Sequence, residues 1–540
     1  MKFTRRHLLK GGAALLAALG LGRFISPAFA ASPVTGEILG ASAKVGHQLW
    51  KRGFPAPAET TEHDTIIIGG GIAGLAAGYR LHKAGMHDFA LLELESATGG
   101  NAQSGNNSVS AYPWGAHYVP LLTEDSKAVR TLFRELDIIT AYDEQGLPVY
   151  NEFYICSDPH ERLYMFGRWQ ETMLPQTSAT DEDHKQYDAF FAYVEDLKNK
   201  RGKDGKRLFA IPVDESAQDP EWLQLDTLTM KEWMDKEGYT SKYLQWHVDY
   251  SCRDDYGTTL EDTSAWAGLH YFAARSGAAA NTDPNGFVTW PEGNGWIVCK
   301  LQEPIGKNIR PHSLVYSVKK ENGGVTVDYF DVRSGISRRI RARTCILATP
   351  QFISSRLQPD EAGAAEFSYA PWAVANITLD KLPEGKGAEL AWDNMIYGSR
   401  LLGYVVATHQ SLKNNPLQTV LTYYWPLSHL PPKEARQEAL DRSYEQWRDI
   451  FLDELLAVHP ELTGHVKQLD VWIWGHAMIR PVKGFIWGEA RRKLLKQEPP
   501  LFRAHSDMSG ISIFEEAYTH GVRAAENALT HLNIKFATEL

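Results

Sequence analysis

Apolar runs of strand length alternate with helical patterns in the region that begins at residue 64. The segment Asp64-Thr-Ile-Ile-Ile-Gly-Gly-Gly-Ile-Ala-Gly-Leu-Ala-Ala-Gly opens with a short apolar run, which ends in glycines and passes directly into a helical pattern. A second apolar run begins at Phe89, after that helix. This order predicts a strand, a tight turn, a helix and a second strand, the opening unit of an α/β fold.

The glycines of the turn, Gly69-x-Gly71-x-x-Gly74, have separate physical roles in this prediction. Gly69 permits the tight turn, Gly71 lets the backbone approach a pyrophosphate, and Gly74 lets the helix pack closely on the strand. The pyrophosphate would lie on the free N–H groups at the helix start, at Ile72 and Ala73, because the helix dipole favours an anion there. An ordinary strand, turn and helix without a ligand is the alternative interpretation.

An acidic residue, Glu93, ends the second predicted strand about 20 residues after Gly74, the spacing expected of an acid that binds ribose. A carboxylate there accepts a hydrogen bond from a ribose 2′-OH and disfavours a 2′-phosphate, which argues against NADP. This context favours a dinucleotide ligand over a turn without a ligand.

Three later segments supply what a large dinucleotide needs, although each one alone is more typical of plain structure. Gly99-Gly100-Asn101 lets the backbone pass close to a ligand. A short apolar strand that begins at Thr344 ends in Ala-Thr349-Pro350. Asp507 precedes a long helical pattern that contains Glu516, which fits a ribityl contact and a flavin over a helix N-terminus. Their common order along the chain indicates FAD.

Taken together, these segments resemble the FAD-dependent amine oxidase superfamily, and the resemblance covers most of the chain after the N-terminal region. Pro113-Trp-Gly-Ala-His-Tyr118 resembles the family segment that passes the flavin ring. Asp226-Thr-Leu-Thr-Met-Lys-Glu-Trp233 resembles a helix of the family's substrate domain. Gly293-x-Gly295-Trp296 resembles the glycine pair before the helix that leads to the adenine-contacting strand, which would place Val315 near the adenine.

The resemblance implies an α/β fold in which a Rossmann-like FAD-binding domain of the GR2, amine oxidase type is interleaved with an α+β substrate domain. We expect the FAD-binding domain to comprise residues 64–120, 285–355 and 470–540, and the substrate domain residues 121–284 and 356–469. The residues predicted to bind the cofactor are Gly69, Gly71, Ile72, Ala73, Gly74, Glu93, Gly99, Gly100, Asn101, Trp114, Gly115, Ala116, His117, Val315, Thr349, Asp507 and Glu516.

The chain departs from the family at three places. Asn101 stands where the family usually has arginine, and Asn376 lies on the strand where many amine oxidases hold a lysine near flavin N5. Of the two aromatic residues that often wall the substrate, residues 484–487 would supply one, whereas the second position falls near Ile511 or Ile513. These departures leave the prediction of FAD intact but weaken amine oxidation as the specific reaction.

Two segments are candidates for substrate contact. Residues 249–257 and 266–272 place acids beside aromatics, which would hold an ammonium group by charge and cation–π attraction; the alternative is a solvated acidic loop before a packed aromatic helix. Residues 472–481 alternate as a strand does, with His476 or Arg480 as candidates to face the flavin, although a structural histidine is the alternative for His476. The candidates for catalysis are Asp255, His270, Arg480 and Trp487.

The N-terminus has the features of an export signal. Thr4-Arg5-Arg6 precedes an apolar stretch over residues 11–21, and Ala28-Phe-Ala30 supplies small residues before a cleavage point, so residues 1–30 resemble a twin-arginine signal peptide. A general secretory signal is the alternative. The twin-arginine translocase carries folded proteins with their cofactors, so we expect a periplasmic protein without a stable membrane span. Residues 31–63 have the composition of an arm or linker.

Composition and charge narrow the function further. The net charge of −10 argues against a nucleic-acid partner. The four cysteines are far apart, without metal-ligand spacing, and are expected to be buried free thiols. The resemblance to the amine oxidase superfamily, with the predicted signal peptide, implies an exported FAD-dependent oxidoreductase that transfers hydride from an amine-type substrate to flavin N5, with O₂ or another acceptor reoxidising the flavin. A desaturase or isomerase of an apolar substrate and a non-catalytic flavoprotein subunit are the alternatives.

Overall fold

The computed structural model describes residues 34–51, 53–358, 366–411 and 417–540, and residues 35–540 form one compact unit. The predicted signal peptide, residues 1–30, lies outside the described residues. Within the described ranges, no helix is both long and apolar enough to cross a membrane.

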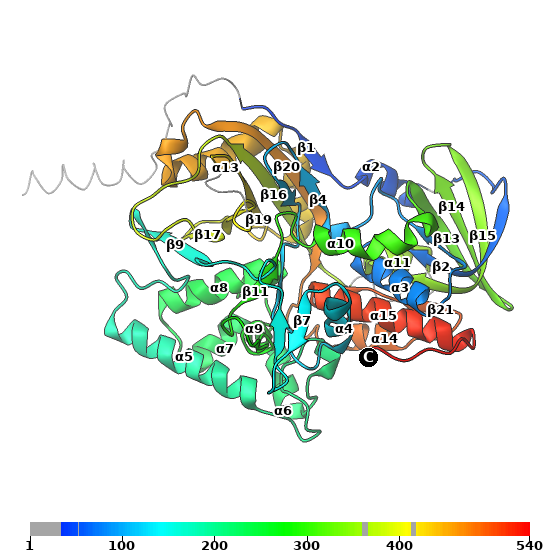
Figure 1. The fold of residues 1–540 in the computed structure, drawn as a ribbon, viewed down its shortest axis with the longest axis horizontal. Coiled ribbons are helices and arrows are strands. Elements are labelled where there is room, and N and C mark those ends of the chain that lie inside the picture. The colour runs from blue at the N-terminus through cyan, green and yellow to red at the C-terminus, as the bar shows by residue number, and fades with distance from the viewer. Residues whose placement is uncertain (1–33, 52, 359–365, 412–416) are drawn as a thin grey trace, which may run out of the picture. The chain divides into compact units, whose positions relative to one another are not determined.

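The first of two large sheets is built on the predicted strand–turn–helix unit (Figure 1). Its parallel strands follow the order β12, β3, β2, β15 and β21, with an antiparallel hairpin, β13 and β14, on the earlier part of β15. The strands are β2 (Thr60–Ile68), β3 (Phe89–Leu92), β12 (Ile309–Arg310), β13 (Ser313–Glu321), β14 (Gly324–Asp331), β15 (Ile336–Leu347) and β21 (Leu501–Arg503).

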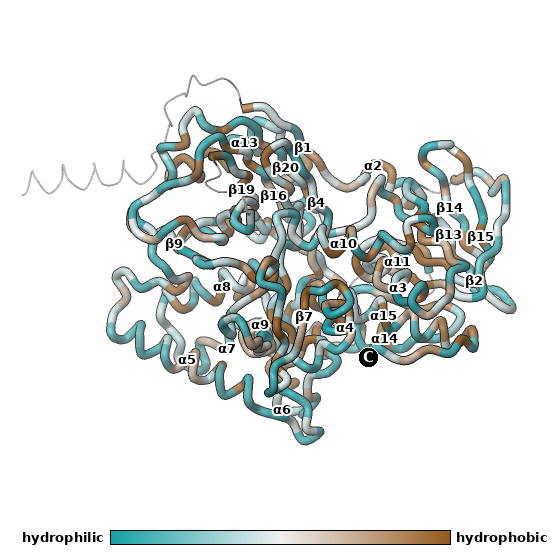
Figure 2. Tube along the Cα trace, viewed as in Figure 1, coloured by the Kyte–Doolittle hydropathy of each residue, from teal (hydrophilic) through white to brown (hydrophobic). Residues whose placement is uncertain are grey.

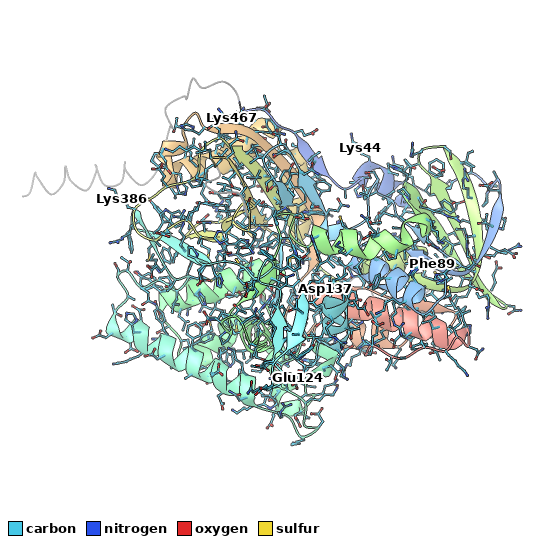
Figure 3. All side chains as sticks on the ribbon, in the orientation of Figure 1. Lys44, Phe89, Glu124, Asp137, Lys386 and Lys467 are labelled. Atoms are coloured by element: carbon cyan, nitrogen blue, oxygen red, sulfur yellow. The ribbon has the colours of Figure 1, made fainter. Side chains whose placement is uncertain are left out.

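Two helices pack against each other beside this sheet. α3 (Ile72–Lys83) follows the glycine turn, and α15 (Phe514–His531) is the predicted C-terminal helix. Close approach requires small residues, because a Cβ atom at Gly521 of α15 would lie 2.3 Å from the Ala73 carbonyl oxygen of α3. Hydrophobic residues concentrate around α3 (Figure 2), and Phe89 lies beside this helix, 2% exposed (Figure 3).

A second sheet has eight strands in the order β1, β20, β16, β19, β18, β17, β9 and β10. It is antiparallel apart from the pairs β1–β20 and β17–β9. The strands are β1 (Ile38–Gly40), β9 (Glu161–Met165), β10 (Arg168–Gln170), β16 (Tyr369–Leu379), β17 (Asp393–Ile396), β18 (Gly403–Val406), β19 (Thr419–Pro426) and β20 (Val466–Ile479).

Helices of the central region pack below this sheet as drawn in Figure 1 and share one hydrophobic core. Capping boxes start two of them, at Thr180 and Thr229, which satisfies backbone N–H groups at the helix starts. The helices of this region are α5 (Asp181–Asn199), α6 (Pro220–Leu223), α7 (Met230–Lys236), α8 (Lys242–Tyr256) and α9 (Ala265–Ala273).

Smaller elements connect these parts. The remaining helices are α2 (Ala43–Gly46), α4 (Lys127–Glu135), α10 (Gly295–Gln302), α11 (Gln351–Leu357), α12 (Pro432–Asp441), α13 (Tyr444–Val458) and α14 (Glu489–Leu495). The remaining strands form pairs outside the two large sheets: β4 (Ser104–Asn106) with β5 (Ala111–Pro113), β6 (Tyr118–Pro120) with β11 (Phe287–Thr289), and β7 (Ile139–Tyr142) with β8 (Pro148–Tyr150).

The structure differs from the expected segment boundaries at two places. The predicted boundary at residue 470 falls inside β20, which begins at Val466 and pairs with β16 of the second sheet. The predicted linker 31–63 contains strand β1 and the first residues of β2. The cause is the same in each case: β1, β20 and the first residues of β2 pair with strands far away in sequence, so local composition carries no signal for these pairings.

The four cysteines are free in the structure, and three of them, Cys156, Cys252 and Cys345, are buried. Cys299 is exposed. The expectation of buried free thiols is therefore confirmed for three of the four.

Candidate cofactor and active site

A long cavity lies at the carboxyl ends of the parallel strands β2, β3 and β15, where open α/β sheets bind their ligands. We call it the cofactor cavity. A second cavity adjoins it, and residues of several elements line both. These shared residues are Asn101, Ala116, Asn294, Ala477, Ser512, Ile513 and Phe514.

The glycine turn between β2 and α3 forms one wall of the cofactor cavity. Gly69 has a φ of +102°, which L side chains rarely adopt. A Cβ atom at Gly74 would lie 1.9 Å from the Gly69 carbonyl oxygen, so this glycine sets the spacing of helix and strand. A Cβ atom at Gly71, in contrast, would approach only the Cα of Gly100, at 4.0 Å. The space in front of Gly71 is therefore left for a ligand.

Glu93 is held at the end of β3 by backbone hydrogen bonds. Its Oε2 accepts from the Gly70 N–H at 2.7 Å, and its Oε1 accepts from the Glu95 N–H at 2.8 Å. Burial raises the pKa of this carboxyl, and the backbone N–H groups oppose that rise. The carboxylate keeps lone pairs free toward the cavity, as the binding of ribose hydroxyls requires.

Asp507 presents a buried carboxylate oxygen at the cavity. Its Oδ2 accepts from the Gln351 N–H at 2.7 Å and from the Tyr369 hydroxyl at 2.5 Å, whereas its Oδ1 accepts no hydrogen bond and lies 3.1 Å from the His505 Nδ1. Burial acts to raise the pKa of Asp507, but the charge of His505 and these hydrogen bonds lower it below the usual range. An ionised acceptor in a buried site fits a ligand hydroxyl, such as those of the ribityl chain of FAD. The residues present therefore fit FAD.

Most of the predicted cofactor residues line one of the two cavities. Those lining the cofactor cavity are Gly69, Gly71, Ile72, Ala73, Glu93, Gly99, Gly100, Asn101, Ala116, Val315, Thr349 and Asp507. Gly115 and His117 line the second cavity, which Asn101 and Ala116 also reach. Gly74 lies behind the turn, where it packs against Gly69.

Two predicted cofactor residues have structural positions instead. Glu516 is fully buried, where its Oε1 accepts from the Val213 N–H at 2.7 Å and its Oε2 accepts from the Ser509 hydroxyl. Trp114 packs within an aromatic cluster, and its carbonyl oxygen accepts from the Trp474 indole N–H at 2.6 Å. Neither side chain lines a cavity. In each case the neighbouring residue does so instead, Glu515 next to Glu516 and Gly115 next to Trp114.

The second cavity has aromatic walls and acidic groups. α8 supplies Asp254 and Asp255, and α15 supplies Glu515. Half of the aromatic residues come from the second sheet. They are His117, Tyr118, Trp372, Tyr424, Trp474 and Phe514. Among the described residues that line this cavity, Arg275 is the only lysine or arginine.

The three carboxyl groups of this cavity differ in whether they form an ion pair. Asp255 pairs with the Arg275 guanidinium, which also donates to the Tyr271 carbonyl oxygen at 3.0 Å. Burial raises the pKa of Asp254 to about 7, and the neighbouring charge of Asp255 adds to the rise. Burial likewise raises the pKa of Glu515 to about 7, and the Oε1 of this residue has no hydrogen-bond partner. The cavity thus contains two carboxyl groups that a cationic ligand would stabilise in the ionised form.

Of the four candidates for catalysis, only Asp255 lies in the cavity. His270 is buried, with its Nε2 hydrogen-bonded to the Ala210 carbonyl oxygen at 2.8 Å, and Arg480 pairs with Asp262 at 2.6 Å. Trp487 packs edge-on against Trp266. The structure thus places these three residues outside the cavity. Groups distant in sequence bind the His270 Nε2 and the Arg480 guanidinium, whereas the His270 Nδ1 and the Trp487 Nε1 are buried without a hydrogen-bond partner.

The structure also resolves the alternatives left open for two segments. Residues 249–256 belong to the helix α8, so the interpretation as a solvated acidic loop was wrong. His476 lines the cofactor cavity, where it stacks on Phe352 at 4.3 Å between ring centres. Burial lowers the pKa of His476 to about 4, so the ring is neutral at pH 7.

Several cavity residues were missed by sequence reasoning. Asn376, expected near the flavin, instead donates to the Pro113 carbonyl oxygen at 3.0 Å, and Val374 and Trp372 of the same strand line the cavity. Strand alternation places residues 372, 374 and 376 on one face, and this signal could have found the first two. No local pattern singles out Arg275, which follows α9 without a motif.

Comparisons with known proteins agree with this geometry. Residues 67–136 match the family described as the NAD(P)-binding Rossmann-like domain. No curated protein matches the sequence significantly.

Solved structures extend the likeness to the whole fold. A double mutant of putrescine oxidase is similar with a TM-score of 0.64 and 17% identity, over 87% of this chain and 100% of that one. Cyclohexylamine oxidase from Brevibacterium oxydans IH-35A has a TM-score of 0.59 and 16% identity, over 88% and 100%. A fatty acid isomerase from P. acnes that produces CLA has a TM-score of 0.59 and 15% identity, over 87% and 98%. The predicted fold class, α/β with a Rossmann-like dinucleotide-binding domain, is thereby confirmed.

Gly71→Val tests the cofactor cavity. The protein has room for the new side chain, so the variant should fold, but the valine would occupy the space left for the pyrophosphate and the purified protein should be colourless. Gly306→Val is the matched control, because a Cβ atom there meets nothing within 4 Å and Gly306 does not line the cavity. Absorbance of bound flavin and thermal unfolding measure the two outcomes, and a fully yellow Gly71→Val protein would contradict the prediction.

Proposed function

We propose that the protein oxidises a small amine, with bound FAD accepting the hydride. The observation that carries this proposal is the second cavity, which adjoins the cofactor cavity and combines aromatic walls with three carboxyl groups. Aromatic faces and carboxylates are the groups that bind an ammonium ion by cation–π attraction and charge. A purely apolar cavity would favour a substrate without charge.

Asp254 and Glu515 have a second role in this proposal, as proton acceptors. Bound FAD supplies an electron pair acceptor at flavin N5, and hydride leaves a carbon next to nitrogen only when that amine is neutral. Carboxyl groups with a pKa of about 7 bind the ammonium form when ionised and can take its proton. Arg275 keeps Asp255 paired, so that Asp255 does not compete for the substrate.

The alternative of a desaturase or isomerase acting on an apolar substrate draws support from the aromatic walls and from the likeness to a fatty acid isomerase. Against it stand Asp254 and Glu515, because an apolar ligand would leave both carboxyl groups buried without a partner. A non-catalytic flavoprotein subunit gives no reason for a cavity beside the cofactor.

We further propose that the protein is exported to the periplasm by the twin-arginine translocase and that O₂ or another acceptor reoxidises the flavin. The support is the sequence around Arg5-Arg6 and the buried cofactor cavity, which must be filled before the folded chain is exported.

Anaerobic mixing with a panel of amines tests the proposed reaction. A substrate amine should bleach the oxidised flavin in a single turnover, and readmitted air should restore the colour if O₂ is the acceptor. Fatty acids and other apolar compounds serve as the comparison panel. Bleaching by none of the amines, in protein that carries a full complement of FAD, would count against amine oxidation.

Amide substitution of the two carboxyl groups tests their role. Glu515→Gln and Asp254→Asn should each raise KM for a cationic amine by about 10- to 150-fold, the equivalent of a lost hydrogen bond to a charged group of about 1.5–3 kcal/mol. In the wild type, KM should fall as pH rises through about 7, because both carboxyl groups ionise there. This pH dependence should weaken in each variant. Glu124→Gln, on an exposed residue away from both cavities, is the control.

Conservative substitution of the arginine pair tests the export proposal. Arg5→Lys with Arg6→Lys keeps the charge but removes the guanidinium pair, so the flavoprotein should accumulate in the cytoplasm. Cell fractionation with flavin measurement checks the result. Continued export of the double variant would indicate the general secretory route.

A further inference from the structure

The segment before β2, residues 34–51 and 53–59, runs past the opening of the cofactor cavity, and we call it the N-terminal arm. Its first part is fixed to the second sheet: Ile38–Gly40 pair with Val471–Ile473 of β20, and Gly36 lies so close that an added Cβ would be 1.8 Å from the Leu469 carbonyl oxygen. Figure 1 shows β1 beside β20 and α2 between this sheet and the β13–β14 hairpin.

The middle of the arm is hydrogen-bonded to Glu95, which follows β3 two residues after Glu93. The Ser42 N–H and hydroxyl donate to the two carboxylate oxygens of Glu95, each at 2.8 Å. The Glu95 N–H in turn donates to Glu93, whose other oxygen accepts from Gly70 in the glycine turn. A continuous chain of hydrogen bonds therefore links the arm to the groups that face the cofactor.

After Ser42, the arm itself becomes part of the cavity wall. Gly46 and Leu49 line the cofactor cavity together with Glu93 and Val315, whereas Lys44 points outward (Figure 3). The next residue, Trp50, lies under the guanidinium of Arg356, whose Cζ is 5.0 Å from the ring centre. Arg356 belongs to α11, another element that lines the cavity. The two ends of this short stretch are thus held by different elements, Ser42 by Glu95 after β3 and Trp50 by Arg356 of α11.

A last contact fixes the arm beyond the cavity. Phe54 stacks on Tyr316 of β13, with ring centres 4.3 Å apart and planes 7° apart. Tyr316 directly follows Val315, which lines the cavity. The stretch between Ser42 and Trp50 therefore bridges two firm anchors, a strand pairing before it and an aromatic stack after it.

We propose that residues 42–50 of the arm are a clasp, which closes over FAD after the cofactor is seated and slows its release. The inference rests on the FAD site of the proposed function and adds a fourth chain segment to it. The clasp is held by few contacts of its own, namely the Ser42–Glu95 hydrogen bonds and the Trp50–Arg356 stack. It can therefore open while β1 and Phe54 stay in place, and FAD enters or leaves in the open state.

The double variant Ser42→Ala with Trp50→Ala removes the side-chain contacts of the clasp without changing a residue that lines the cavity. We expect it to fold and bind FAD, but to release FAD at least tenfold faster than the wild type. The measurement is the rise of free-flavin fluorescence after dilution of the loaded protein. Phe153→Ala, which removes an exposed aromatic side chain far from the cavity, should release FAD at the wild-type rate.

Hydrogen exchange gives a second readout that does not depend on the variant. The amides of residues 43–50 should exchange slowly with FAD bound and faster in the apoprotein, while the amides of β20 that pair with β1 stay protected in both. Equal exchange of residues 43–50 in both forms, or an unchanged release rate in the folded double variant, would overturn the clasp and leave the FAD site intact. Wild-type protein that cannot be loaded with FAD would overturn both.

Discussion

The close approach of α3 to β2 is the constraint on which the rest of the site depends. No side chain separates Gly74 from the Gly69 carbonyl oxygen, so the helix begins directly at the carboxyl end of the strand. Its free N–H groups then point into the cofactor cavity, where the helix dipole favours an anion. The Gly70 N–H is used by Glu93, and the Gly70 carbonyl oxygen accepts from the Gly99 N–H at 2.8 Å. One turn thus positions the segments that hold both ribose and pyrophosphate.

The second cavity shows how burial prepares a site for charge. Asp255 and Arg275 neutralise each other, whereas Asp254 and Glu515 share no such partner, and burial raises the pKa of both to about 7. A buried carboxyl group without a counter-ion is costly when ionised, and a bound ammonium ion would remove that cost. In the empty cavity no such partner is present, so burial keeps the pKa of both groups raised.

Local patterns carried the prediction of the cofactor, whereas three of the four candidates for catalysis lie outside the cavity, where long-range contacts decide the position of a side chain. Gly69, Gly71 and Glu93 belong to one strand–helix–strand unit, whose spacing alone fixes their relative positions. His270 and Arg480 are polar residues of the expected kind, yet Ala210 binds the His270 Nε2 and Asp262 binds the Arg480 guanidinium. The pairing of residues far apart in sequence decides which polar group is free, and no pattern in a single segment records it.

The position of the N-terminal arm likewise depends on residues far away in the sequence. Its composition is that of a linker, and its one strand has only three residues, so its position depends on β20, more than 400 residues later in the chain. Because β1 of the arm pairs with β20, the arm can take up its folded position only when the second sheet has formed. If FAD binds beneath the clasp, the cofactor must be present before residues 42–50 settle on Glu95 and Arg356. Seating of FAD is then a late step in folding, because the arm settles only after the second sheet has formed.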